Sequence, residues 1–169
     1  MKSKEVEVIL SLGSNVGDAL ANLAKAYLLL EQNCGEIVQA SSYYESEPWG
    51  FEADQNFVNT ALILKTKLLP LELLDELKSI ETQMGRDISP KKGYSSRIID
   101  IDIIDYNQEV VTFDRLQIPH KHMKERCFVL QPLLEICPDY QCPLSVDFDL
   151  TSTVEILNCS SILKIIPTT

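Results

Sequence analysis

The sequence of 169 residues lacks several features that each mark a large class of proteins. Its apolar residues form no uninterrupted run near the roughly 18 that a membrane-spanning helix needs, so we expect no membrane span. No G-x-x-x-x-G-K-[ST] segment is present, which excludes a P-loop nucleotide-binding protein. The only two histidines, His120 and His122, have no accompanying cysteine spacing typical of structural zinc.

Cysteine is scarce and irregularly spaced. Five cysteines form an odd set with no C-x-x-C pair, which predicts scattered reduced thiols in a cytoplasmic protein. The N-terminal stretch "MKSKEVEVIL" leads straight into alternating apolar and acidic positions, a pattern typical of a strand and not of a signal peptide. We therefore expect a cytoplasmic location.

Positive charge is in short supply. A formal net charge of −10 argues against general nucleic-acid binding. Two short segments are nevertheless basic, "RDISPKKGYSSR" at 86–97 and "RLQIPHKHMKER" at 115–126, and they flank a pair of aspartates. Such a basic collar around carboxylates indicates an anionic ligand that binds together with a cation. A chance cluster of charges on a solvated face is the alternative.

The length and the 45% apolar content predict one globular domain over residues 1–169. Alternating or continuous apolar patterns predict strands at 5–12, 36–46, 57–67 and 98–105, and helical spacing predicts helices at about 20–33 and 70–84. The order β-α-β-β-α-β is that of the ferredoxin-like α+β fold, in which two helices cover one face of an antiparallel sheet. Beyond it we expect extra C-terminal elements, a helix at 131–136 and a final strand near 161–166.

The stretch "SSRIIDIDII" places two carboxylates in an otherwise apolar strand. Asp100 and Asp102 share one face, with roughly 6.6 Å between their Cα atoms, while Ile99, Ile101 and Ile103 take the opposite face, toward the core. Two carboxylates so close repel each other, and a pair of Mg²⁺ ions that also bind phosphates removes this conflict. Arg97 lies three residues earlier and suits phosphate binding. An outward-facing strand with ordinary acidic residues is the alternative.

The segment "GYSSRIIDIDII" resembles the signature of the 6-hydroxymethyl-7,8-dihydropterin pyrophosphokinase family of folate biosynthesis. Three further segments, "SLGSNVGD", "SSYYESEPWGFEADQNFVN" and "RLQIPHKHMKERCFVLQPL", resemble other parts of this family in the same order, over residues 8 to about 138. The resemblance implies a ferredoxin-like fold and transfer of pyrophosphate from ATP to the hydroxymethyl group of the pterin, with release of AMP. With the charge and the apolar pattern described above, we expect no nucleic-acid or membrane partner, and we infer no obligate protein partner.

The resemblance also implies roles for individual residues. Asp100 and Asp102 would bind two Mg²⁺ ions and, with Arg86 and Arg97, form the catalytic group. The implied nucleotide-binding residues are Glu81, Arg97, Arg115, Gln117, His120, Lys121 and Arg126, and the implied pterin-binding residues are Ser46, Glu47, Trp49, Phe57, Asn59 and Phe128. The residues themselves support part of this, because Phe57 and Asn59 share a strand face and together suit a flat heterocycle. Phe57 as a core residue is the alternative, and we expect His122 to be structural.

The chain departs from the family pattern just before the aspartates. Ile88 replaces a frequent arginine, whose charge Lys91 or Lys92 would supply, and Tyr94, Ser95 and Ser96 replace a frequent Trp-Gly-Pro arrangement. The segment 86–96 is polar and contains Pro90 and Gly93. We expect it to be mobile without ligand and to close over both substrates.

Two other functions stay open at this point. A non-catalytic ferredoxin-like binding module would need no metal pair, and its aspartates would be replaceable. A different metal-dependent nucleotidyl or phosphoryl transferase on the same fold would keep the aspartates, but the implied pterin-binding residues argue against it. No side chain in the sequence is a convincing general base.

Overall fold

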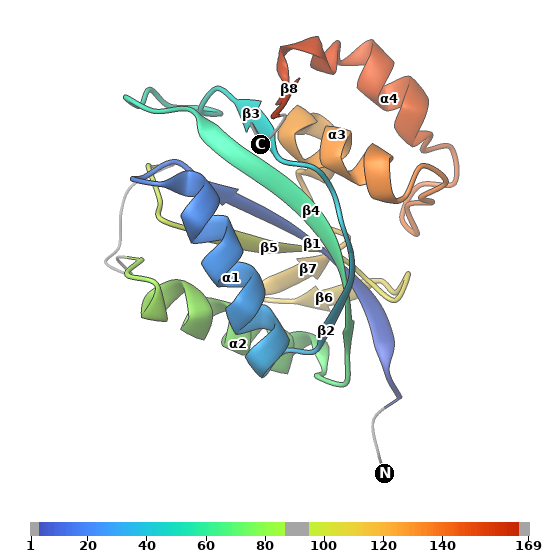
Figure 1. Cartoon of the computed structure of the whole chain (residues 1–169). Coiled ribbons are helices and arrows are strands. Elements are labelled where there is room, and N and C mark those ends of the chain that lie inside the picture. The colour runs from blue at the N-terminus through green and yellow to red at the C-terminus, as the bar shows by residue number, and fades with distance from the viewer. Residues whose placement is uncertain (1–3, 87–94, 166–169) are drawn as a thin grey trace.

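The computed structural model describes residues 4–86 and 95–165, so most of the predicted closing segment 86–96 lies outside the described residues. A six-stranded sheet forms the centre (Figure 1). Its strands follow the order β5-β1-β4-β3-β8, and β2 also pairs with β4. Their bounds are β1 (Val6–Ser14), β2 (Glu36–Ala40), β3 (Tyr44–Ser46), β4 (Phe57–Thr66), β5 (Asp100–Tyr106) and β8 (Leu163–Lys164).

The strand predicted at 36–46 is divided into β2 and β3, which pair antiparallel with different parts of β4. Between them, the Ser41 hydroxyl accepts a hydrogen bond from the Ala61 amide at 2.9 Å, so a side chain takes the place of a ladder partner. If β2 and β3 are counted as one interrupted strand, the sheet runs β5-β1-β4-β2/β3 with antiparallel neighbours. This arrangement confirms the predicted ferredoxin-like fold.

Two helices, α1 (Ala19–Asn33) and α2 (Pro70–Gln83), lie side by side on one face of the sheet (Figure 1). Asp18 begins α1, since its carboxylate accepts a hydrogen bond from the Ala21 amide at 3.0 Å. Pro70 occupies the first turn of α2, where a missing N–H costs nothing. The apolar stripes of both helices meet one sheet face, which includes the predicted core residues Ile99, Ile101 and Ile103.

The other face of the sheet carries a second apolar cluster under α3 (Cys127–Ile136), with α4 (Leu150–Ile156) packed on α3. Ile9 of β1 and Ile104 of β5 belong to this cluster. The predicted helix at 131–136 is the second half of α3, and β8 covers two residues of the strand predicted near 161–166. The remaining elements are the hairpin strands β6 (Val111–Phe113) and β7 (Leu116–Ile118) and the 3₁₀ helices η1 (Met123–Glu125) and η2 (Cys159–Ser161).

The cysteine prediction is wrong for two residues. A disulfide joins Cys127 at the start of α3 to Cys159 at the start of η2, across 32 residues of sequence. Cys34, Cys137 and Cys142 are free. The spacing carries no local signal, because the two residues meet only when the chain after α3 folds back over it. The cysteines therefore give no support for a reducing compartment.

The helices in the described ranges are short. α1 is 15 residues long and carries Lys25 and Glu31 on its exposed side. None of the described helices is both long enough and apolar enough to cross a membrane.

Candidate active site

The two aspartates project from β5, which lies at an edge of the main sheet. Their partners on the neighbouring strand β1 are small, since Gly13 is opposite Asp100 and Ser11 is opposite Asp102. Both carboxylate side chains keep about 30% or less of their surface exposed, 27% for Asp100 and 30% for Asp102. β1 thus leaves open space in front of two largely covered carboxylates.

Asp100 is held by two arginines. Its carboxylate oxygens lie 2.8 Å from an Nη1 atom of Arg86, just after α2, and 2.8 Å from Nη1 of Arg97, just before β5. Burial alone would raise the pKa of Asp100, but the charges of Arg97 and Arg86 outweigh it, and the pKa lies below its usual value. Asp100 is therefore an ionised carboxylate with a fixed orientation.

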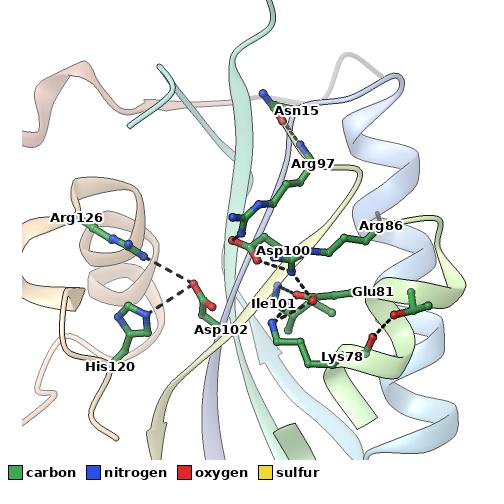
Figure 2. Close-up of polar contacts among 11 residues, drawn as sticks. Asn15, Lys78, Glu81, Arg86, Arg97, Asp100, Ile101, Asp102, His120 and Arg126 are labelled. Carbon is green, nitrogen blue, oxygen red and sulfur yellow. Dashed lines mark hydrogen bonds and ion pairs between the residues drawn. The ribbon is translucent and has the colours of Figure 1, made fainter. Parts of the chain in front are cut away.

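Asp102 has a different environment. Its Oδ2 lies 3.8 Å from Nη1 of Arg126 and 4.0 Å from Nε2 of His120, both beyond hydrogen-bond length (Figure 2). Burial, and then the charge of Asp100, raise the pKa of Asp102 to about 7. The negative charge of Asp102 is thus poorly compensated by the protein, and an added cation would relieve this repulsion.

Glu81 fixes the backbone between the two aspartates. Its side chain is 1% exposed, and its Oε1 accepts a hydrogen bond from the Ile101 amide at 2.7 Å. The same carboxylate pairs with Lys78 at 3.0 Å and with Arg86 (Figure 2). Because β5 is an edge strand, its outward amides need such partners outside the sheet. The nucleotide contact predicted for Glu81 stays a prediction, since these groups occupy its carboxylate here.

Asn15, directly after β1, anchors the approach to β5. Its Oδ1 accepts from the Arg97 amide at 2.7 Å, and its Nδ2 donates to the Ser96 hydroxyl at 3.1 Å. The backbone N–H of Asn15 also donates a hydrogen bond to the Arg97 carbonyl at 3.1 Å. Asn15 is only 2% exposed, so its polar side chain needs hydrogen-bond partners inside the protein. This burial cannot be read from the sequence, and sequence reasoning missed the role.

His120 faces Asp102 as a hydrogen-bond donor. Its Nδ1 accepts the backbone amide of His122 at 3.2 Å, which leaves the proton of the neutral ring on Nε2, the atom nearest Asp102. Burial, and then the charge of Arg126, lower the pKa of His120 to about 4. At neutral pH the ring is therefore uncharged and suited to donate to an oxygen ligand.

Most of the predicted pterin residues meet in one hollow, here called the inner cavity. It is lined by Ser11, Gly13, Ser46, Trp49, Phe51, Phe57, Asn59, Ser95, Arg97, Asp100, Asp102, Arg126 and Phe128. Glu47 is the exception among the predicted residues, because it lines a separate hollow beside Glu52 and Asp54. Sequence reasoning missed Ser11, Gly13, Phe51 and Ser95.

The polar floor of the inner cavity is built around Asn59. Its Nδ2 donates to the Ser46 hydroxyl at 2.8 Å, which sets the direction of the amide group. Gly13 lies opposite Asn59 in the sheet, and a Cβ atom at Gly13 would approach Asn59 Oδ1 to 3.0 Å. The glycine thus leaves room that any side chain would take from this amide.

Aromatic residues form the walls of the inner cavity. The rings of Phe51 and Phe57 meet edge to face, with centroids 6.1 Å apart. Phe57 is half-buried and lines the cavity, so it is not enclosed in the apolar core. On the opposite wall, the Arg126 guanidinium lies 4.8 Å from the Trp49 ring and 5.6 Å from the Phe128 ring. The cavity therefore presents flat apolar surfaces around a few oriented polar groups, as sites for planar heterocycles do.

A second hollow, here called the outer cavity, lies on the α2 side of Asp102. It is lined by Leu74, Lys78, Ile101, Asp102, Ile103, Asp114, Arg115, Leu116, Gln117, His120 and Lys121. Four predicted nucleotide residues are among these, while Lys78 and Asp114 were missed. Arg115 is held by Asp75 of α2 through a two-point ion pair, with Nη2 at 3.0 Å from Oδ2. Asp102 is the residue that the linings of the two cavities share.

Comparison with known proteins adds independent evidence. Residues 9–138 match the model of the family described as 7,8-dihydro-6-hydroxymethylpterin-pyrophosphokinase (HPPK). A 2-amino-4-hydroxy-6-hydroxymethyldihydropteridine pyrophosphokinase of Aquifex aeolicus is 43% identical over 163 residues, which cover 94% of this chain and 98% of the relative. The protein of the same name from Bacillus subtilis is 41% identical over 129 residues, 76% of each chain.

Solved structures give the same fold. A crystal structure of HPPK-DHPS in complex with substrates superposes with a TM-score of 0.71 at 18% identity, over 90% of this chain and 43% of the other. A Plasmodium falciparum HPPK-DHPS triple mutant gives 0.73 at 19% identity, over 92% and 44%. This chain therefore spans less than half of those chains, and at such identity the likeness concerns the fold alone.

Proposed function

Because the chain belongs to the 7,8-dihydro-6-hydroxymethylpterin-pyrophosphokinase family and acts as a pyrophosphokinase of folate biosynthesis, we propose a division of the substrates between its two cavities. The pterin binds in the inner cavity and ATP in the outer cavity. The pyrophosphoryl group passes between them at Asp102, and AMP is released. The observation that carries this proposal is that Asp102 lines both cavities.

On the pterin side, the ring stacks between Phe57 and Phe128. Asn59 bonds to the polar rim of the ring, and the Ser46 hydroxyl keeps the Asn59 amide in the required direction. Trp49 covers the cavity from the side of Arg126. In this position the hydroxymethyl group of the pterin points toward the two aspartates at the other end of the cavity.

On the nucleotide side, Arg115, Gln117 and Lys121 line the outer cavity together with His120. Asp75 orients Arg115 from α2, so the guanidinium is fixed before ATP arrives. The neutral His120 ring donates a hydrogen bond from its Nε2–H group to a phosphate oxygen. Arg126 and Arg97 contact the same phosphates from the inner cavity, where their charges are already partly removed from water.

The residues present fit the two Mg²⁺ ions that the sequence predicts. Asp100 and Asp102 supply hard carboxylate oxygens, and the uncompensated charge of Asp102 is the feature that a cation would neutralise. Among the described residues no group of three or more His, Cys, Asp or Glu side chains surrounds a common point. Phosphate oxygens and water would therefore complete the coordination. When bound, the ions supply charge neutralisation across the triphosphate.

The chain's own contribution to the reaction is positioning and charge stabilisation. Arg86 and Arg97 hold Asp100, Glu81 holds the backbone between the aspartates, and Asn15 holds Arg97. The arginines and His120 are thus in place before negative charge moves to the oxygen of the departing AMP.

The identity of the nucleotide product tests the reaction. We expect protein incubated with ATP, Mg²⁺ and 6-hydroxymethyl-7,8-dihydropterin to release AMP, and to release none when the pterin or Mg²⁺ is omitted. Chromatographic separation of the nucleotides measures both products. Accumulation of ADP would indicate a simple kinase, and absence of turnover would favour a binding module.

A further inference from the structure

The chain beyond the family-matched region is attached to two elements that carry lining residues of the inner cavity, β3 and α3. Residues 150–165 contain α4, η2 and β8, and are here called the C-terminal clasp; they follow the residues 9–138 that match the family model. Figure 1 shows α4 above α3 and β8 beside β3. The clasp itself lines neither the inner nor the outer cavity.

The clasp is attached to β3 through the main sheet. β8 pairs with β3, with Lys164 opposite Tyr44 and Leu163 opposite Glu45. The Ile165 amide also donates to the Tyr43 carbonyl at 2.8 Å. β3 ends at Ser46, the residue that orients Asn59, so this strand carries the polar end of the proposed pterin site.

The clasp is attached to α3 by the Cys127–Cys159 disulfide. Cys127 lies between Arg126 and Phe128, which both line the inner cavity, whereas Cys159 is 4% exposed and belongs to η2. A covalent bond at residue 127 restrains the backbone of both neighbours. Cys159 does not line the cavity itself, and its direct covalent link to the cavity lining is the bond to Cys127.

Glu135 joins the other end of α3 to the same group of elements. Its carboxylate accepts from the Ser42 amide at 3.2 Å and from the Tyr44 hydroxyl of β3, and it lies 3.5 Å from Lys164 of β8. α3 is thus fixed near its C-terminal end by polar contacts and at its first residue by the disulfide. The position of Phe128 relative to β3 depends on both attachments.

We propose that the Cys127–Cys159 disulfide is a positioning bond for Arg126 and Phe128, and that its reduction by a dithiol weakens pterin binding. This inference rests on the proposed placement of the pterin in the inner cavity. A thiolate of the dithiol attacks one sulfur of the disulfide and displaces the other as a thiolate, which takes up a proton. The second thiol of the reagent then resolves the mixed disulfide. The dithiol supplies two electrons and two protons and becomes a cyclic disulfide, and the protein gains two thiols.

The effect should be selective for the pterin. Phe128 is one face of the proposed stack, and a wall that is already ordered binds a planar ring at lower entropic cost than a loose one. The nucleotide residues Arg115, Gln117 and Lys121 precede Cys127, and Asp75 of α2 holds Arg115 independently. Opening the disulfide leaves that contact in place. Arg126 is the proposed phosphate contact that it loosens, so nucleotide affinity should fall, but by less than pterin affinity.

Calorimetric titration can measure this selectivity. The oxidised protein, the protein reduced with dithiothreitol and the variant Cys159→Ala would each be titrated with a non-hydrolysable ATP analogue, and then with 6-hydroxymethyl-7,8-dihydropterin in the presence of that analogue. We expect reduction or Cys159→Ala to weaken pterin binding by at least about fivefold and analogue binding by a clearly smaller factor. Cys159→Ala should not respond to dithiothreitol, whereas the control Cys137→Ser should respond like the natural sequence. Reoxidation with oxidised glutathione should restore pterin affinity.

Three outcomes would overturn the inference. The first is equal pterin affinity before and after reduction. The second is an equal loss of pterin and nucleotide affinity in a protein that melts near the titration temperature. The third is a count of five titratable thiols, instead of the three that are free here, in denatured protein that was never exposed to reductant. The proposed function fails by a different result. The inner cavity is not the pterin site if the oxidised protein binds no pterin. The same conclusion follows if the variant Phe57→Ala binds pterin as tightly as the natural sequence does.

Discussion

Asp100 and Asp102 differ in what the folded protein does to their charge, although they are two residues apart on the same strand. Arginines lower the pKa of Asp100, whereas burial and the charge of Asp100 raise that of Asp102. Neutralising each residue should therefore have opposite effects on the metal-free protein. We expect Asp100→Asn to lower the melting temperature at pH 8 and Asp102→Asn to leave it unchanged or raise it.

The sign follows from proton linkage. A carboxyl with a raised folded-state pKa costs stability in full above a pH of about 7. This cost shrinks as the pH falls below 7 and is gone only below the unfolded-state pKa of about 4. The advantage of Asp102→Asn should thus shrink between pH 8 and pH 5, as scanning calorimetry in the presence of a chelator can measure. Both variants should still lose at least about 100-fold in kcat/KM with unchanged circular dichroism. Full activity in either would contradict the metal assignment.

Metal binding should depend on pH for the same reason. A cation can bind Asp102 only after its proton has left, so a carboxyl with a pKa of about 7 should bind Mg²⁺ about tenfold less well at pH 6 than its ionised form does. We expect calorimetric titration of the complex with an ATP analogue to show this loss between pH 8 and pH 6. Asp102→Asn separates the effect from the titration of the nucleotide, since only the latter remains. An identical pH dependence in both proteins would contradict the prediction.

At the scale of elements, Glu81 connects α2 to β5. The side chain is 1% exposed between two cations and accepts the Ile101 amide. Glu81→Gln removes the buried charge that pairs with the largely covered Arg86, so we expect a loss of at least about 2 kcal/mol in the free energy of unfolding. Urea denaturation measures this loss. Glu76→Gln is the matched control on the same helix, at a residue that lines neither cavity, and an equal effect there would contradict the role of Glu81.

The proposed pterin stack also depends on two elements, because Phe57 belongs to β4 and Phe128 to α3. An aromatic contact contributes roughly 0.5–1.5 kcal/mol beyond the apolar area that it buries. Phe57→Ala and Phe128→Ala should therefore weaken pterin binding by at least about tenfold, with much smaller effects on an ATP analogue titrated alone.

Phe113→Ala, at an exposed phenylalanine of β6, serves as the control for that titration. If the two cavity variants lose both affinities together and melt far below the natural sequence, the phenylalanines are core residues.

Local sequence patterns predicted the elements whose partners are near in sequence or strongly patterned. The strand at 98–105, the two helices of the main core and the shared face of Asp100 and Asp102 all followed from spacing. The division of the strand at 36–46 did not, because it depends on the Ser41 hydroxyl meeting β4. The start of α3 at Cys127 was also missed, because the residues just before Cys127 show no helical pattern. The disulfide partner of Cys127 is 32 residues away in the sequence.

The same limit applies to the site. Sequence and resemblance named most residues that line the two cavities, but not the contacts by which one residue holds another. Asn15 holds Arg97, and Ser46 holds Asn59, across 82 and 13 residues of sequence. Contacts of this kind depend on how strands are brought together, which residue spacing does not express. Glu47 shows the converse, because its neighbour Ser46 lines the inner cavity and it does not.

At the scale of the whole molecule, one sheet serves two apolar clusters. β1 gives Val8 and Leu10 to the cluster under α1 and α2, and Ile9 to the cluster under α3. Neither cluster can lose its sheet face without exposing the other, so we expect one cooperative unfolding transition. Trp49, the single tryptophan, lies at the inner cavity. Its fluorescence and the far-ultraviolet circular dichroism should give the same midpoint, and an earlier fluorescence transition would show that the α3 side unfolds separately.

The outer side of β5 has a further consequence for how the molecules behave in concentrated solution. An open strand edge offers free amides and carbonyls to the edges of other molecules, and this is a common start of aggregation. Here the Ile101 amide is taken by Glu81, and the Ile104 carbonyl accepts the His120 amide at 2.9 Å. These contacts therefore also prevent the edge of β5 from pairing with a strand of a neighbouring molecule. The variant Glu81→Gln weakens one of them, so it should also become more prone to self-association.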